Sequence, residues 1–404
     1  MTYVIIDGRG IIPDRVTKID NSAFENCTRL ETIVIPDSVT LIEEAAFANC
    51  ENLKSIVIPD SVTKIEAWAF SSCISLKSIV IPDSVTEIGN LTFSDCRSLQ
   101  SIEIPSSVKT IEAEAFSGCT SLKSIMIPSG ITCIKEWTFC DCTSLESVVI
   151  PDNVTEIRCC AFNRCDNLTS IIVSKNNPEY KSDNNCILTK DGKTLVLCRN
   201  HNIPDGVTCI IGGAFSGYSS LESIVIPDGV KTIAECEFMC CTGLKSIVIP
   251  DSVTKIEGWA FDGCTSLQSI VIPDSVIEID EWAFSDCASL QSIVIPDGVK
   301  TIEYSVFSGC TSLESIVIPD SVIAIDEWAF GGCYSLQSIT IVTQEKDPDQ
   351  SRERIEYLLQ SLFEYPKEFY LKVPIGCGNA YRHHPAFDGK FVEIIAAKQI
   401  LKKR

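Results

Sequence analysis

The dipeptide Ile-Pro returns at a constant interval, and this spacing constrains the fold more than any other feature of the chain. Successive prolines are 23 residues apart, one unit extends to 30 residues, and Ser174 and Val342 take the proline position in two units. The period defines fourteen units, thirteen of them 23 residues long. Because a fixed period of this size is the signature of stacked repeats, residues 1–342 are expected to form a solenoid.

A single unit, residues 53–75, predicts the course of each coil. Residues 55–58 alternate and are β-branched, as in a short strand, and Pro59 ends the strand because it has no amide hydrogen. Val62 and Ile65 return to the core in a second short strand, and Ala69-Phe70 leads into a helical or 3₁₀ turn. One unit cannot bury its own apolar face, so stacked units must share a core. The inward positions are Leu53, Ile56, Ile58, Val62, Ile65, Phe70, Cys73 and Leu76.

The pattern Leu53-x-x-Ile56-x-Ile58-Pro59, Val62-x-x-Ile65, Ala69-Phe70-x-x-Cys73-x-x-Leu76 resembles the BspA-like leucine-rich-repeat family. The resemblance covers about residues 11–342. It implies a leucine-rich-repeat solenoid with a parallel sheet on one face, and adhesion or host-interaction roles, often for members displayed on the cell surface. Leucine-rich repeats in general place Asn or Cys where Ser61 stands here, so no asparagine ladder is expected.

The 30-residue unit, residues 174–203, is predicted to contain a β-hairpin around Asp191-Gly192, because Asp-Gly between apolar runs is a strong hairpin signal. This hairpin is either a tolerated insertion or a recognition feature. Cys186 and Cys198 flank it and face each other only if the register centres on Gly192. A bridge between them requires an oxidising environment, and free thiols are the expected state.

Residues 343–404 depart from the period and are expected to form an α+β module that caps the last coil, since solenoids need such caps. A helix is predicted from Pro348 to Leu362, and strands over 368–374 and 391–395. A short helical turn is predicted over 380–385.

The chain carries a net charge of −21 with an isoelectric point near 4.6, which argues against nucleic-acid and anionic-membrane partners. No run approaches the roughly 18 apolar residues of a membrane span, so no membrane insertion is expected. The N-terminus lacks a basic segment followed by a long apolar stretch, which predicts a cytoplasmic location. The family resemblance implies the alternative, a cell-surface or secreted protein.

Twelve of the 22 cysteines recur at one position of the repeat, from Cys27 to Cys333, and are expected to be reduced thiols packed in the core. Cys140-x-Cys142 and Cys159-Cys160 do not give the spacing of a tetrahedral metal site. The chain has three histidines, and no nucleophile, base and acid converge in its pattern. We therefore expect no catalytic site, no metal and no cofactor.

The candidate binding surface consists of side chains that the strand alternation points outward, beside a rung that holds all five tryptophans. Glu103 and Met126 interrupt the valine row, and both a binding stripe and an ordinary exposed sheet fit it. The tryptophans are expected to pack over neighbouring coils, with an exposed pair in two adjacent units. The candidates are Val57, Val80, Val225, Val248, Val271, Val294, Val317, Ser246, Ser269, Ser292, Trp259 and Trp282.

An aspartate follows the proline in most units, as Asp60 follows Pro59, where it favours a solvated turn or, alternatively, a cation site. The leading functional hypothesis is a scaffold that binds a protein partner. The alternative is a structural solenoid that self-associates. An enzyme or carbohydrate-binding module, with its site at the hairpin or the C-terminal module, is less favoured.

Overall fold

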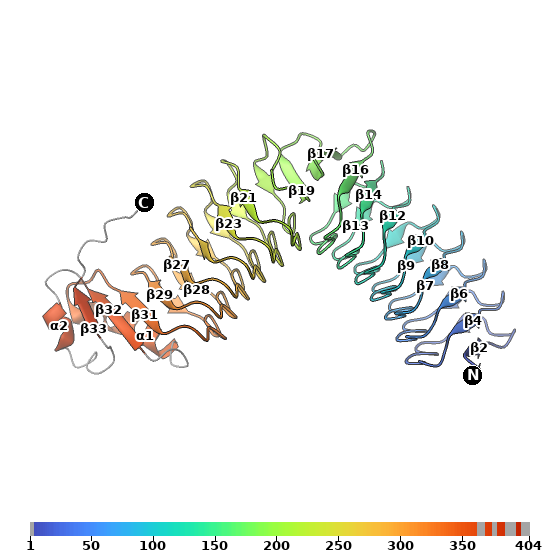
Figure 1. The fold of residues 1–404 in the computed structure, drawn as a ribbon, viewed down its shortest axis with the longest axis horizontal. Helices are drawn as coiled ribbons and strands as arrows, with labels where there is room; N and C mark the ends of the chain where they lie inside the picture. Colours follow the sequence, from blue (N-terminus) through green and yellow to red (C-terminus); the bar gives the residue numbers. More distant parts are fainter. Residues whose placement is uncertain (1–3, 362–367, 374–377, 384–392, 397–404) are drawn as a thin grey trace. The chain divides into compact units, whose positions relative to one another are not determined.

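The computed structural model describes residues 4–361, 368–373, 378–383 and 393–396 (Figure 1). The chain divides into two compact units. Unit 1 consists of Met1–Asn200 and Ile211–Tyr218, and unit 2 consists of His201–Ile210 and Ser219–Arg404. Each unit contains a stack of similar coils.

The outward face of unit 1 is lined by short strands at the predicted positions. Equivalent residues of successive coils pair in parallel, as Ser55 pairs with Thr32 and Val57 with Val34, so each coil repeats the register of the one before. The chain enters this sheet through an antiparallel pair between β1 (Val4–Ile6) and β2 (Arg9–Ile11). The remaining strands are β4 (Thr32–Val34), β6 (Ser55–Val57), β8 (Ser78–Val80), β10 (Ser101–Glu103), β12 (Ser124–Met126), β14 (Ser147–Ile150) and β16 (Ser170–Val173).

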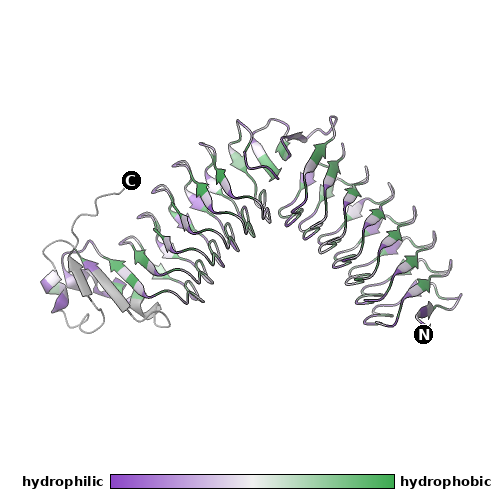
Figure 2. Ribbon diagram, in the orientation of Figure 1, coloured by the Kyte–Doolittle hydropathy of each residue, from purple (hydrophilic) through white to green (hydrophobic). Residues whose placement is uncertain are grey.

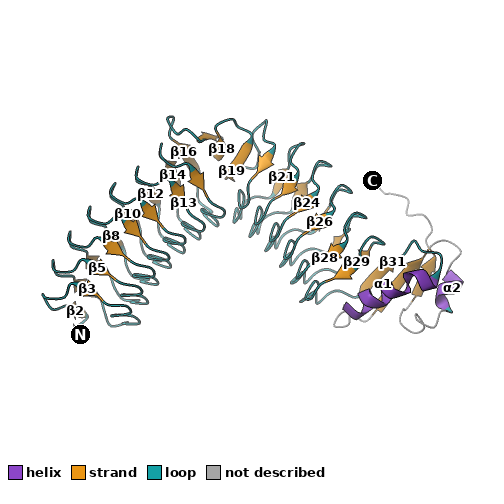
Figure 3. Cartoon of the chain, turned by 180° about the vertical axis from the view of Figure 1, so that it is seen from behind, coloured by secondary structure: helices purple, strands orange, loops and turns teal. Residues whose placement is uncertain are grey.

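A second, two-residue strand follows the proline turn in each regular coil, as the sequence predicted. Ile65 pairs with Ile88, and the ladder continues between Ile88 and Ile111. Figure 3 shows that loops and turns make up most of each coil. The second strands of unit 1 are β3 (Lys18–Ile19), β5 (Leu41–Ile42), β7 (Lys64–Ile65), β9 (Glu87–Ile88), β11 (Thr110–Ile111), β13 (Cys133–Ile134) and β15 (Glu156–Ile157).

The Ala-Phe segment differs from the predicted helical or 3₁₀ turn, because it is a series of tight turns. Its amides alternate between two kinds of acceptor. Phe47 N–H donates to the Ala69 carbonyl of the next coil at 2.8 Å, whereas Ala48 N–H closes a turn onto Ala45 within its own coil. Positive φ angles recur four residues apart, as at Trp68 (55°) and Ser72 (56°), and prevent helical propagation.

The core follows the predicted inward positions. Leu53, Ile56, Ile58, Val62, Ile65, Phe70, Cys73 and Leu76 are all buried. The phenylalanine rings stack in parallel from coil to coil, with centroids 5.3 Å apart between Phe47 and Phe70 and 5.5 Å apart between Phe70 and Phe93. Figure 2 shows hydrophobic residues recurring at the strands of successive coils. The solenoid fold class is confirmed.

The 30-residue unit forms an antiparallel meander within unit 1, which confirms the hairpin. It comprises β17 (Tyr180–Asp183), β18 (Cys186–Thr189) and β19 (Thr194–Cys198), and β17 was not predicted. The turn is held by the Asp191 carboxylate, which accepts the Lys193 N–H at 2.9 Å.

Cys186 and Cys198 form a disulfide, so the expectation of free thiols was wrong. The two residues are directly opposed on β18 and β19, the register that centres on Gly192, with Cα atoms 4.1 Å apart. The strand pairing next to the cysteines sets this opposition. A bulge between Ile187 and Leu188 gives the rest of the hairpin a different register.

Unit 2 repeats the same coil. Its outward strands are β21 (Ser223–Val225), β23 (Ser246–Val248), β25 (Ser269–Ile270), β27 (Ser292–Ile293), β29 (Ser315–Ile318) and β31 (Ser338–Val342). The second strands are β20 (Cys209–Ile210), β22 (Thr232–Ile233), β24 (Lys255–Ile256), β26 (Glu278–Ile279), β28 (Thr301–Ile302) and β30 (Ala324–Ile325).

The C-terminal segment continues the sheet of unit 2. Strand β32 (Glu368–Val373) pairs in parallel with β31, and β33 (Glu393–Ala396) pairs in parallel with β32. Helices α1 (Pro348–Ser361) and α2 (Gly378–Arg382) confirm two predicted helical segments. Leu362, Pro374, His384, Pro385 and residues 391–392, which belong to the predicted elements, lie outside the described residues.

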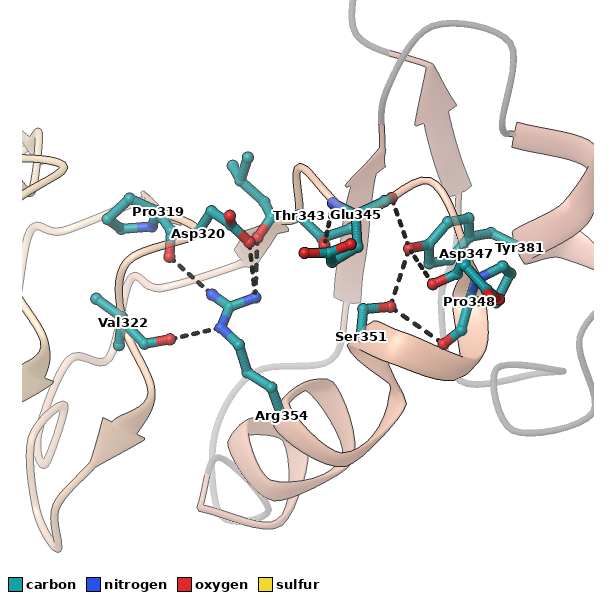
Figure 4. A network of polar contacts seen from close by, with 11 residues as sticks. Pro319, Asp320, Val322, Thr343, Glu345, Asp347, Pro348, Ser351, Arg354 and Tyr381 are labelled. Carbon is teal, nitrogen blue, oxygen red and sulfur yellow. Dashed lines mark hydrogen bonds and ion pairs between the residues drawn. The ribbon is translucent and has the colours of Figure 1, made fainter.

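Helix α1 begins as its sequence predicts, with Asp347 accepting the Asp349 N–H and Pro348 in the first turn. Arg354 then fastens α1 to the solenoid. Its guanidinium donates to the carbonyls of Val322 (2.6 Å), Pro319 (2.8 Å) and Val342 (3.1 Å) (Figure 4). One side chain therefore joins the helix to backbone groups of the last coils.

Candidate binding faces

The valine–serine face is the outward side of the main strands in each unit. In unit 2 its valines are Val225, Val248, Val271, Val294 and Val317, and its serines are Ser223, Ser246, Ser269, Ser292 and Ser315. All ten are exposed, and Val271 and Val294 expose 80% and 73% of their surface. The predicted orientation of this row is confirmed, since Ile247, between Ser246 and Val248, is buried.

The same face in unit 1 is less uniform. Val57 and Val80 expose 65% and 67% of their surface, but Glu103 follows them and Met126 comes next. Unit 2 therefore offers the longer uninterrupted aliphatic row. The Ser and Val rows of adjacent strands pair in register, as Val225 does with Val248, so the side chains stand at the spacing of parallel strands, about 4.8 Å.

The five tryptophans occupy one rung, as expected, but their exposure differs from the prediction. Trp328 and Trp68 are the most exposed, at 56% and 40%, whereas Trp259 and Trp282 are half-buried. The rings of Trp282 and Tyr304 pack edge to face, with centroids 5.4 Å apart. Each tryptophan has a positive φ, which the repeat imposes at this position and which sequence periodicity does not reveal.

The aspartates after the prolines lie in turns, and all but Asp320, which is half-buried beside Arg354, are exposed. The serine that follows them forms an unpredicted ladder. Ser61 Oγ donates to the Val39 carbonyl of the preceding coil at 2.6 Å, and Ser84 repeats this contact with Val62. Serine thus supplies the coil-to-coil hydrogen bond at the position where other leucine-rich repeats place asparagine.

The cysteine rung is a second hydrogen-bonded ladder. Cys73 Sγ donates to the Phe47 carbonyl, and Cys96 Sγ to the Phe70 carbonyl, both at 3.2 Å. These residues are thiols, as expected. Burial raises the pKa of Cys96 to about 12, and the same cause raises the pKa of Cys50 to about 12.

These pKa values predict that the ladder thiols resist alkylation in the folded protein. At pH 7 roughly one thiol in 10⁵ is ionised when the pKa is near 12, and the thiolate is the nucleophile. We expect maleimide to label exposed Cys209 in native protein and to label Cys96 only after unfolding in urea, as measured by peptide mass spectrometry. Equal native rates at Cys96 and Cys209 would contradict the buried ladder.

Arg199, a buried residue that the sequence did not single out, completes the hairpin unit. Its Nη2 donates to the carbonyls of Phe162 (2.7 Å) and Ser216 (3.0 Å), and its guanidinium lies 5.7 Å from the centroid of the Tyr218 ring. The Phe162 carbonyl is the group that a ladder cysteine would reach in a regular coil. In the irregular unit, Arg199 therefore donates the hydrogen bond to this carbonyl that a cysteine donates in the regular coils.

Glu237 is a second unpredicted buried residue, at a position where most coils have alanine. One carboxyl oxygen accepts the Ala234 N–H at 2.8 Å, and the other, Oε1, has no hydrogen-bond partner. Burial raises the pKa of Glu237 well above its usual value of 4.5, with a further contribution from Glu257. The folded chain therefore holds this carboxyl neutral at pH values where the unfolded chain ionises it.

We predict that Glu237→Ala raises the free energy of unfolding by about 1–2 kcal/mol at pH 7.5, because it removes a buried oxygen without a partner. The wild-type chain should lose stability as pH rises above 4.5, since the unfolded state releases this proton first. Urea unfolding at several pH values measures both effects. A variant with an unchanged pH profile would show that Glu237 does not titrate as described.

Neither helix in the described residues is long and apolar enough to cross a membrane. The coil, the parallel register and the leucine, phenylalanine and cysteine rungs together define a leucine-rich-repeat solenoid. The BspA type leucine rich repeat region, in six copies, matches residues 10–119, 86–187, 195–312 and 232–350. The chain belongs to this family.

Three solved structures are similar to this chain. A leucine-rich repeat protein from Bacteroides ovatus is 30% identical, with 92% of this chain and 90% of that chain covered and a TM-score of 0.45. One from Eubacterium ventriosum is 24% identical, with 82% and 92% covered and a TM-score of 0.55. The pneumococcal vaccine antigen PcpA is 19% identical, with 98% and 88% covered and a TM-score of 0.53. Comparison with curated proteins gave no match.

Proposed function

We propose that this leucine-rich-repeat scaffold binds a partner protein through the valine–serine face of unit 2. The observation that carries the proposal is the uninterrupted row of five exposed valines, from Val225 to Val317, on paired or adjacent strands. Contiguous exposed apolar surface is uncommon on proteins that have no partner. The backbone is fixed by coil-to-coil hydrogen bonds, so binding would order few groups of the scaffold.

The partner we propose presents a flat apolar surface with hydroxyl or amide groups at its edge. The exposed serines, such as Ser246 and Ser269, supply donors and acceptors beside the valines. Gln268 and Gln291 flank the same strands and add neutral polar groups. The proposal gives the chain no catalytic step and requires no cofactor.

Adhesion or host interaction at the cell surface is the setting we propose for this binding. The Cys186–Cys198 disulfide supports it, because disulfides persist in oxidising compartments and are rare in the cytosol. PcpA, which shares the fold, is described as a vaccine antigen. A cytoplasmic location is the alternative, and reduction of the disulfide in protein isolated from its native source would favour it.

The first test is light scattering over about a hundredfold range of protein concentration, with wild type and the double variant Val248→Glu/Val271→Glu. Introduced charges on an apolar interface are expected to weaken it strongly. A monomer at every concentration supports a separate partner. Assembly that the double variant abolishes would instead support the self-associating solenoid.

The second test identifies the partner by cross-linking through a photoreactive group at Val294 and then measures its affinity. We expect Val248→Glu/Val271→Glu to weaken binding at least about tenfold, equivalent to about 1.4 kcal/mol. Ile323→Glu is the control, since Ile323 is 59% exposed in the same unit but lies outside the valine–serine face. Equal losses in both variants would refute the assignment to this face.

A further inference from the structure

Another surface of unit 2 combines exposed aromatic rings with acidic side chains. Trp259, Trp282 and Trp328 occupy the tryptophan rung, and Tyr304 lies against Trp282. Trp328 is 56% exposed and Tyr304 37% exposed. The rings belong to four consecutive coils, so they form a row along the stack rather than an isolated contact.

Acidic residues one or two positions before the tryptophan rung, in four consecutive coils, enclose a hollow. The hollow has a volume of about 590 Å³ and is lined by Trp259 and by five carboxylates, those of Glu235, Glu257, Asp280, Glu281 and Glu303. We call these residues, with Trp282 and Tyr304, the acid–aromatic face. Burial raises the pKa of Glu303, and the neighbouring carboxylates of Asp326, Asp280 and Glu281 raise it further.

The equivalent positions of unit 1 show that the repeat itself does not dictate this charge. There the acids have basic neighbours: Lys18 pairs with Glu43 at 2.8 Å and Lys135 with Glu112 at 2.5 Å. In the described part of unit 2, Lys255 makes the ion pairs on these positions, to Glu278 and Asp280. At these positions, the coils from Glu235 to Glu327 therefore carry more net negative charge than those of unit 1, and this charge lies beside aromatic rings.

We propose that the acid–aromatic face binds a segment of a partner protein that is rich in arginine or lysine. Carboxylates bind guanidinium groups through charge-assisted hydrogen bonds, and a tryptophan ring attracts a cation over its face. The hollow admits one such side chain beside Trp259, and the ring row extends the contact to adjacent coils. This surface is distinct from the valine–serine face, so the proposal goes beyond the function proposed above.

The test uses a fluorescein-labelled peptide of twelve residues that alternates arginine and glycine, with binding followed by anisotropy at two salt concentrations. The variant Glu257→Gln/Glu281→Gln/Glu303→Gln should weaken binding at least about tenfold. The matched control, Asp251→Asn/Asp274→Asn/Asp297→Asn, removes the same charge from the turns of the same unit and should change binding less than about twofold. Circular dichroism checks that both variants fold.

Trp259→Ala should weaken binding several-fold, whereas Trp68→Ala in unit 1 should leave it unchanged. The fold should tolerate the replacement, because Ala45 has the same left-handed backbone at this position of the repeat, with φ 55°. Val271→Glu should not weaken peptide binding, which separates this inference from the valine–serine face.

Three results would overturn the inference. Equal losses in the two charge variants would show only attraction to the acidic chain as a whole. Absence of peptide binding at low salt would exclude the cationic segment. Displacement of the peptide by micromolar Ca²⁺, with unchanged affinity in Trp259→Ala, would make the carboxylates a metal site instead.

Discussion

Phe261→Ala is expected to lower the free energy of unfolding by about 3–5 kcal/mol, the range for removing a buried phenylalanine from a packed core. Phe261 is completely buried and stacks between Phe238 and Phe284, with ring centroids 5.4 Å and 5.2 Å away. Both neighbouring rings would lose a parallel partner. The backbone around the cavity cannot close it easily, because the Phe261 N–H is fixed to the Ala283 carbonyl of the next coil.

Urea unfolding followed by circular dichroism measures this loss. Val271→Ser is the control in the adjacent coil, since Val271 is 80% exposed and its replacement should change stability by less than about 0.5 kcal/mol. A loss below about 0.5 kcal/mol for Phe261→Ala would mean that the phenylalanine row is not the centre of the core. A large loss for Val271→Ser would reverse the assignment of inward and outward sides.

The inward and outward sides of the coil could be predicted from sequence because each unit repeats the same alternation of residues. Alternation at Ser55, Ile56 and Val57 is weak evidence in one strand, but its recurrence at a fixed period leaves one consistent assignment. The position of Pro59 also fixes where the strand ends. Periodicity therefore predicted the solenoid, its core and the orientation of the valine–serine face.

The backbone of the Ala-Phe segment could not be predicted in the same way. Trp68 has few of the properties that favour a left-handed conformation, and its φ of 55° results from the hydrogen bonds between its coil and the next. The serine ladder could not be predicted either. The sequence indicates only that Ser61 is a turn residue, and the structure adds its hydrogen bond to the Val39 carbonyl of the preceding coil. Both features arise from contacts between coils and not from local preference.

Of the two candidate surfaces, one could be predicted from the sequence and the other could not. The valine row recurs in most coils and was visible in the sequence. The acid–aromatic face depends on which coils carry Glu257, Glu281 and Glu303 together, and on the hollow beside Trp259. Rows of acidic residues recur along this chain, so only the geometry distinguishes this group from solvated turns. Arg199 and the Cys186–Cys198 bond likewise required the register of the broken unit.

The second large effect is expected at Arg354, where Arg354→Met should lower the free energy of unfolding of the C-terminal segment by about 2–4 kcal/mol. The guanidinium donates to the carbonyls of Pro319, Val322 and Val342 and lies 3.5 Å from the Asp320 carboxylate (Figure 4). Methionine keeps most of the side-chain volume but leaves three backbone acceptors without this donor. Arg354→Lys should recover part of the loss, because one ammonium group cannot reach all three carbonyls.

Hydrogen exchange of the α1 and β31 amides measures the loss where it occurs. Arg352→Met is the matched control, because Arg352 lies on the same helix, is 54% exposed and pairs only with Glu356 among the ion pairs of the described residues. Its loss should stay below about 0.5 kcal/mol, as for other exposed pairs one helical turn apart. Equal exchange in the Arg354→Met and Arg352→Met variants would show that apolar contacts of Ile355 and Leu358, which are buried on α1, hold the helix in place. The hydrogen bonds of Arg354 would then add nothing to its stability.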